Sequence, residues 1–109
     1  MKVPNNEIAE IPQGKINLYL LNLDHVDGRS KANFFVQVGY DENSLADTLL
    51  AHVRASDFVE SENSQYGTKY TVDGIVECPS GLSFNLRSVW IIRLEHAVPT
   101  LITAYPSKR

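Results

Sequence analysis

The densest set of reactive side chains in the sequence lies between His25 and Lys31. With Arg29, these residues bring an imidazole, a guanidinium and an ammonium group within seven positions. Gly28 allows a sharp turn, and a predicted helix begins directly after it. Helix N-termini, arginine and lysine favour bound phosphate, and histidine titrates near neutral pH. The segment therefore predicts a site that holds a phosphodiester and moves a proton; the alternative is a solvated loop in which two neighbouring aspartates neutralise the cations.

A second set of hydroxyl, aromatic and cationic side chains falls on predicted strands in the C-terminal half. It comprises Tyr66, Lys69, Tyr70, Arg87, Thr103 and Tyr105. Such groups on a strand face suit phosphoryl or ribose contacts, and aromatic rings can stack on a base. The alternative is that the tyrosines are half-buried strand aromatics, which strands favour in any case.

Other chemistries find little support in the sequence. Cys78 is the only cysteine, which excludes an intrachain disulfide and suits a reducing compartment. The three histidines, His25, His52 and His96, lie far apart with no second cysteine, so we expect no metal site. The glycine-rich and metalloprotease motifs that hold nucleotides or zinc are absent, and we expect no cofactor. His52 is interpreted as a packing or surface residue.

Length and charge limit the class of protein. The chain has 109 residues and a formal net charge of −3, which predicts one domain and argues against a surface that is basic all round. Residues 1–10 lack the apolar run of a signal peptide, and no stretch approaches the ~20 apolar residues of a membrane span. We therefore expect a cytoplasmic protein without membrane contact.

Apolar periodicity predicts three helices in the first half. The first is opened by Pro12 and carries a stripe at Ile16, Tyr19, Leu20 and Leu23. The second is expected from an N-cap at Ser30 to a stop at Gly39, and the third from a cap at Asn43 to about Ala55. The segment from residue 41 to 62 is acidic and is interpreted as a solvated face.

After Ser56 the apolar period changes to two, which is typical of strands. Strands are expected at residues 57–61, 66–76, 82–94 and 100–105, with a bulge at Asp73-Gly74 and a turn at residues 79–81. The order predicts an α+β fold, with about three N-terminal helices packed on one face of a roughly four-stranded antiparallel sheet. The other face carries Arg87 with either Thr103 and Tyr105 or Ile102 and Ala104, and parity leaves that choice open.

Several short motifs are spread over nearly the whole chain. They are Pro4-Asn5, Leu20-Leu21-Asn22, His25-x-x-Gly28-Arg29-x-Lys31-Ala32-x-Phe34-Phe35, Gly39-Tyr40, Tyr66-Gly67-x-Lys69-Tyr70, Trp90-Ile91-Ile92 and Thr103-Ala104-Tyr105-Pro106. Together they resemble a bacterial domain family of unknown function, whose members occur alone or at the C-termini of large adhesin-like and phage-head-like proteins. The chain departs from the pattern at Val26-Asp27, where relatives tend to have Pro-Val. This departure adds an acid beside the basic motif.

The resemblance implies a toxin-like domain, because domains at the ends of adhesin-like proteins are often toxins. The order of helices and then sheet is also similar to the barnase, colicin-nuclease and RelE-like ribonuclease superfold. By that analogy the domain is a metal-independent endoribonuclease, in which the RNA 2′-hydroxyl attacks the adjacent phosphate. The expected partners are RNA, such as tRNA, and a cognate inhibitor protein.

The analogy also implies roles for the two residue sets. His25 is the expected general base or acid, and Arg29 and Lys31 stabilise charge on the phosphorane. Thr103 and Tyr105 orient the phosphate or stack on a base. Further ligand contacts are expected from Lys69, Tyr70 and Arg87.

Two other functions are compatible with the same residues. One is a non-catalytic interaction module that accompanies a toxin or phage component, which fits the acidic net charge. The other is a protein that binds a small phosphate or nucleotide through the basic loop.

Overall fold

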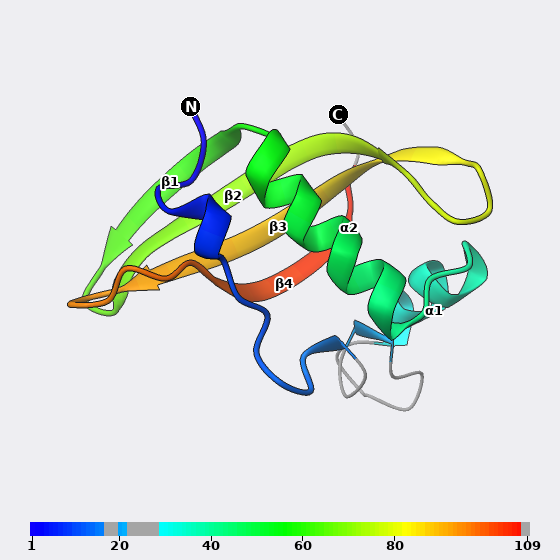
Figure 1. Ribbon diagram of the computed structural model, residues 1–109, viewed down its shortest axis with the longest axis horizontal. Coiled ribbons are helices and arrows are strands. Elements are labelled where there is room, and N and C mark those ends of the chain that lie inside the picture. The colour runs from blue at the N-terminus through cyan, green and yellow to red at the C-terminus, as the bar shows by residue number, and fades with distance from the viewer. Residues whose placement is uncertain (17–19, 22–28, 108–109) are drawn as a thin grey trace.

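The described part of the chain forms two α-helices and a four-stranded sheet. The computed structural model describes residues 1–16, 20–21 and 29–107, with only the backbone for residues 29–31. The elements are a 3-10 turn η1 (Asn6–Ile8), helices α1 (Arg29–Gln37) and α2 (Glu42–Ala55), and strands β1 (Phe58–Ser64), β2 (Gly67–Glu77), β3 (Ser83–Arg93) and β4 (Thr100–Pro106). The sheet is antiparallel in the order β1-β2-β3-β4. Figure 1 shows α2 lying across one face of the sheet, so the architecture is α+β.

Local interactions explain where α1 ends and where α2 begins. Gly39 follows α1 with φ of 95°, and the amide of Tyr40 donates to the Phe35 carbonyl, as in a glycine C-cap. Helix α2 begins with a capping box, in which the Asp41 side chain accepts from the Ser44 amide. The expected caps at Ser30 and Asn43 are therefore wrong, because both residues lie inside their helices.

The prediction of three N-terminal helices is wrong, because the described residues contain two α-helices. Gly14 takes a left-handed φ of 82° just after Pro12, where a right-handed helix cannot continue. The amide of Leu20 then donates to the Lys15 carbonyl, a wider spacing than the α-helical one. The stripe nevertheless marked burial, since Ile16 and Leu20 are both core residues.

The sheet core faces α2. Leu45, Leu49 and Val53 on the helix are fully buried, and they pack in one cluster with Leu86 and Trp90 of β3. Burial of one such leucine stabilises the fold by about 1.5–3 kcal/mol. The apolar side chains at helical spacing on α2 and at alternate positions on β3 thus pack in a single apolar layer.

Two irregularities set which residues share a face. The register of β1 against β2 shifts at Val59, whereas β2 and β3 pair without a break through Asp73 and Gly74, so the expected bulge at that pair is wrong. The second shift lies in β4 at Ile102, between the pairs Val89–Thr103 and Trp90–Leu101. Because of that extra residue, Leu101 and Ala104 both reach the core.

Candidate active site on the sheet

The sheet face away from α2 carries one line of chemically useful side chains. Strand pairing places Arg87 of β3 directly opposite Asp73 of β2 on one side and Tyr105 of β4 on the other. Thr103 lies opposite Val89, on the same face as Tyr105. The bulge in β4 therefore decides the choice that sequence parity left open: Thr103 and Tyr105 share the face of Arg87. We call Asp73, Arg87, Thr103 and Tyr105 the distal cluster.

An ion pair joins two members of the distal cluster. Arg87 donates through Nε to Asp73 Oδ1 and through Nη2 to Asp73 Oδ2, each over 2.7 Å. The Asp73 side chain is only 8% exposed and that of Arg87 is 31% exposed. The hydrogen bond to Asp73 is the largest influence on the pKa of Arg87 and raises it above its usual value, with a further contribution from a hydrogen bond to Tyr105. The guanidinium is thus fixed in plane and permanently charged.

Asp73 was missed as a site residue. The sequence predicts a bulge at this position, but a hairpin centred on the turn at residues 79–81 pairs residue 73 with residue 87. Opposite charges at such facing positions are a recognisable cross-strand signal. That signal was available once the turn had been placed.

The other strand residues of the predicted site, Lys69 and Tyr70, lie apart from the distal cluster. Lys69 is exposed on the same face as Arg87, but it lies four positions before Asp73, about 13 Å along the strand. Tyr70 is on the opposite face, where its ring packs edge-on against Phe58 at 5.0 Å. The side chain of Tyr70 is therefore part of the packing between β1, β2 and α2.

The basic motif lies at the start of α1. Arg29 is the first residue of α1 and Lys31 follows within its first turn, although only their backbone is described. His25 lies outside the described residues. Helix α1 packs against β4, the strand that carries Thr103 and Tyr105. The α1 side of this contact is Phe35, which shares the core cluster with Leu101 and Ala104 of β4, whereas Thr103 and Tyr105 lie on the other face of that strand.

A buried histidine forms a second polar feature, on the α2 side of the sheet. His52 is 3% exposed, and its Nδ1 lies 2.8 Å from Ser88 Oγ. Ser88 Oγ also accepts a hydrogen bond from Trp90 Nε1. Burial lowers the pKa of His52 below its usual value. The interpretation of His52 as a packing residue agrees with this position, but no sequence pattern indicated its polar partners.

Neither a metal cluster nor a membrane helix occurs in the described part of the chain. No three His, Cys, Asp or Glu side chains within residues 1–16, 20–21 and 29–107 come together as metal ligands would. In the same ranges, no helix has the length and apolar character needed to cross a bilayer. The expected absence of a cofactor stays a prediction.

Comparison with known families places the sequence. The model of DUF6883, a domain of unknown function, matches residues 2–108. The chain belongs to the DUF6883 family. The resemblance to a family of unknown function thus has its counterpart in DUF6883, which spans almost the whole chain, and no curated protein matches the sequence.

The DUF6883 fold has a solved structural neighbour. A chain of the "Contact-dependent growth inhibition toxin - immunity protein complex from Klebsiella pneumoniae 342" superposes with a TM-score of 0.74 at 16% sequence identity. The match covers 95% of this chain and 97% of that chain. At this identity the similarity concerns the fold. The expected likeness to ribonuclease toxins stays a prediction.

Proposed function

We propose that this DUF6883 chain is a toxin-like endoribonuclease domain that binds RNA on the sheet face away from α2. The observation that carries the proposal is the strand register that sets Arg87 between Asp73 and Tyr105, with Thr103 on the same face. The shared fold with a chain from a toxin–immunity protein complex supports it.

The geometry suits contact with a phosphodiester. A guanidinium carries five N–H donors, and the Asp73 carboxylate takes two of those on Arg87. The remaining donors belong to a group that the ion pair has already fixed, so little side-chain entropy is lost on binding an anion. A phosphate at Arg87 also lies near the Tyr105 hydroxyl, because the two residues pair directly across β3 and β4.

The proposed reaction is transesterification within the RNA. The 2′-oxygen forms a bond to phosphorus and the bond to the 5′-oxygen breaks, giving a 2′,3′-cyclic phosphate and a 5′-hydroxyl. One group takes the proton of the 2′-hydroxyl and one protonates the departing 5′-oxygen. We assign one of these roles to His25, and charge stabilisation on the phosphorane to Arg87, Arg29 and Lys31. Thr103 and Tyr105 orient the phosphate.

Induced expression in bacteria tests the proposal. Wild type is expected to arrest growth and fragment cellular RNA, and Tyr105→Phe, which removes one hydroxyl, is expected to weaken both effects at matched protein levels. Tyr40→Phe is the matched control, because it removes a buried hydroxyl beside Phe35 in the core. Normal growth with intact RNA in all three cultures would refute the proposal.

One observation favours a second function, the non-catalytic interaction module. The charge of Arg87 is matched by Asp73, and Glu60 and Glu62 are exposed on the same face of β1. A face on which Arg87 is neutralised and two glutamates are exposed also suits a protein partner with cationic side chains. Intact RNA together with stable binding of a purified partner would favour this function.

A further inference from the structure

Strand β2 extends beyond the strand that pairs with one of its edges. The first residue of β1, Phe58, pairs with Val72, whereas β2 continues to Glu77. From Asp73 to Glu77, β2 pairs with β3 on one side. No strand among the described residues pairs with the other side of this segment.

The ladder pattern shows which backbone groups face that open edge. The amide of Leu94 donates to the Tyr66 carbonyl, and the amide of Cys78 donates to the Leu82 carbonyl. Tyr66 and Cys78 flank β2 at even-numbered positions, so the backbone groups of the even-numbered residues of β2 point toward β3. In an antiparallel strand the amide and carbonyl of one residue point the same way, and successive residues alternate. The amides and carbonyls of Ile75 and Glu77 therefore face away from β3. A strand edge of this kind is a template for another extended chain.

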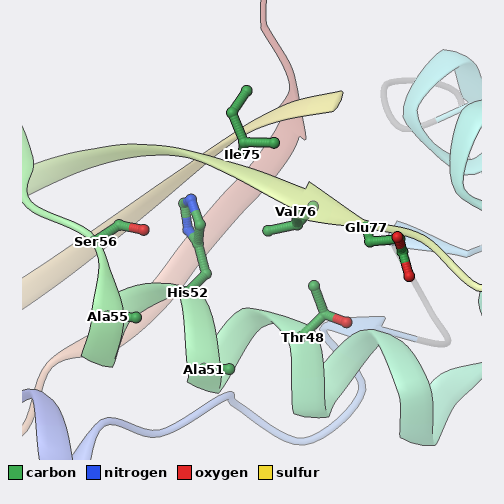
Figure 2. Close-up of a pocket in the computed structure, with 8 residues that line it drawn as sticks. All are labelled: Thr48, Ala51, His52, Ala55, Ser56, Ile75, Val76 and Glu77. Atoms are coloured by element: carbon green, nitrogen blue, oxygen red, sulfur yellow. The ribbon is translucent and has the colours of Figure 1, made fainter. Parts of the chain in front are cut away.

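A groove runs between this edge and α2. Its volume is about 280 Å³. It is lined by Thr48, Ala51, His52, Ala55, Ser56, Ile75, Val76 and Glu77. Figure 2 shows the His52 ring rising from α2 toward β2, with Val76 pointing toward the helix and Ile75 pointing away from it. The groove is thus bounded by a helix on one side and a strand edge on the other.

His52 is a polar side chain in the lining of this groove. Its Nδ1 is hydrogen-bonded to the Ser88 hydroxyl, which also accepts from Trp90 Nε1. Either partner can donate in the His52–Ser88 bond, because a hydroxyl has one hydrogen and two lone pairs. The His52 ring is buried against β2 and therefore forms part of the floor of the groove.

Gly74 keeps the strand close to the helix at this point. A Cβ at this position would overlap the Ser56 side chain and lie 3.3 Å from His52 Nε2. A larger residue would therefore push β2 away from α2. The glycine keeps the strand edge and the helix close enough for one bound chain to contact both.

Charge indicates the kind of chain that fits. Glu77 lines the groove, and Asp47 is exposed on α2 one turn before Ala51. An extended segment with lysine or arginine side chains complements these two carboxylates.

We propose that an extended segment of a partner protein binds here as an additional strand, pairing with Ile75 and Glu77 of β2. It packs over the groove between β2 and α2 and places a cationic side chain near Glu77. Main-chain pairing supplies affinity, and the groove between strand and helix supplies specificity. The groove lies at the α2 side of the β2 edge, so this inference is independent of the proposed ribonuclease function.

A peptide probe tests the proposal. Random peptides displayed on phage are selected on the wild-type protein, and the most enriched sequence is synthesised and titrated into ¹⁵N-labelled protein. We expect enriched peptides with basic residues, large shifts at the amides of Ile75 and Glu77, and slower exchange of both amide protons. No enrichment above background, or shifts confined to other residues, would overturn the proposal.

Two variants locate the pairing. Ile75→Pro removes an amide that faces the open edge and spares the ladder to β3, as proline tolerates such edge positions; it should weaken binding about tenfold or more. Ile75→Thr keeps the amide and should bind like wild type. Ala51→Arg, on the exposed helix wall, should abolish binding by filling the groove. Unchanged binding of the peptide to both Ile75→Pro and Ala51→Arg overturns the proposal. Amide shifts that depend on protein concentration in the absence of peptide also overturn it, because they would identify a second copy of the chain as the occupant.

Discussion

The Asp73–Arg87 pair allows a quantitative test of the distal cluster. Arg87→Met keeps the length of the side chain but leaves the Asp73 carboxylate without its guanidinium. Breaking a fully buried pair costs about 3–5 kcal/mol. Because 31% of the Arg87 side chain is exposed and 8% of that of Asp73, water compensates in part. We expect a loss of about 2 kcal/mol in the free energy of unfolding, or roughly 10 °C in Tm.

A double-mutant cycle isolates the interaction. Asp73→Asn in the Arg87→Met background removes the uncompensated charge, so the double variant should regain about 1 kcal/mol. Urea denaturation followed by circular dichroism measures all four proteins. Lys69→Met is the control on the same face and should change stability by less than about 0.5 kcal/mol, because Lys69 is exposed. Strictly additive single losses, or equal stability of Arg87→Met and Lys69→Met, would refute the reasoning.

Two further predictions concern the fold around the site. Burial lowers the pKa of His52, so below about pH 6.5 the unfolded chain binds more protons than the folded protein, and stability falls as the pH drops toward the folded-state pKa. In urea denaturation at pH 7.5 and 5.5, His52→Gln should therefore lose less stability on acidification than wild type. An identical loss in the two proteins would contradict this. Gly67→Ala should lower the free energy of unfolding by about 2 kcal/mol or more, because φ is 140° and a Cβ would lie 2.7 Å from Arg93 Cα. Gly81→Ala, where φ is 92° and no atom lies within 4 Å of the Cβ position, should cost about half as much, and equal losses in thermal melts would count against the steric argument.

Periodicity in the sequence predicted the parts of the fold that depend on burial. The stripe at Leu45, Leu49 and Val53 and the parity of Leu86 and Trp90 correspond to the observed core. The prediction of a first α-helix was wrong because the stripe reports which residues are buried, and Gly14 takes a left-handed φ. The amides of Leu20 and Leu21 then bond to carbonyls five residues earlier, so the spacing of buried residues did not distinguish an α-helix from this wider π-type turn.

The candidate site was partly predictable for a similar reason. Arg87, Thr103 and Tyr105 were selected by residue type, but their common face depended on the extra residue Ile102, which no sequence pattern marked. Tyr70 was assigned to the ligand by the same residue-type argument, and strand pairing places it on the face toward α2. Residue types indicated the chemistry, whereas strand register determined which side chains meet.

The free β2 edge was beyond sequence reasoning. It arises because β1 begins at Phe58 opposite Val72 while β2 continues to Glu77. The difference is one of strand length and register, which follow from how the chain leaves α2 after Ser56. Neither composition nor periodicity carries that information.

The most direct test of the proposed function uses an RNA–DNA chimeric oligonucleotide with one ribonucleotide. The purified protein is incubated with it in EDTA, and the products are examined by mass spectrometry beside an all-deoxy control. The account predicts cleavage only after the ribonucleotide, a 2′,3′-cyclic phosphate on the upstream product, and a slower reaction with Tyr105→Phe. An intact oligonucleotide across a series of pH values and ribonucleotide identities, or equal cleavage of the all-deoxy control, would contradict it.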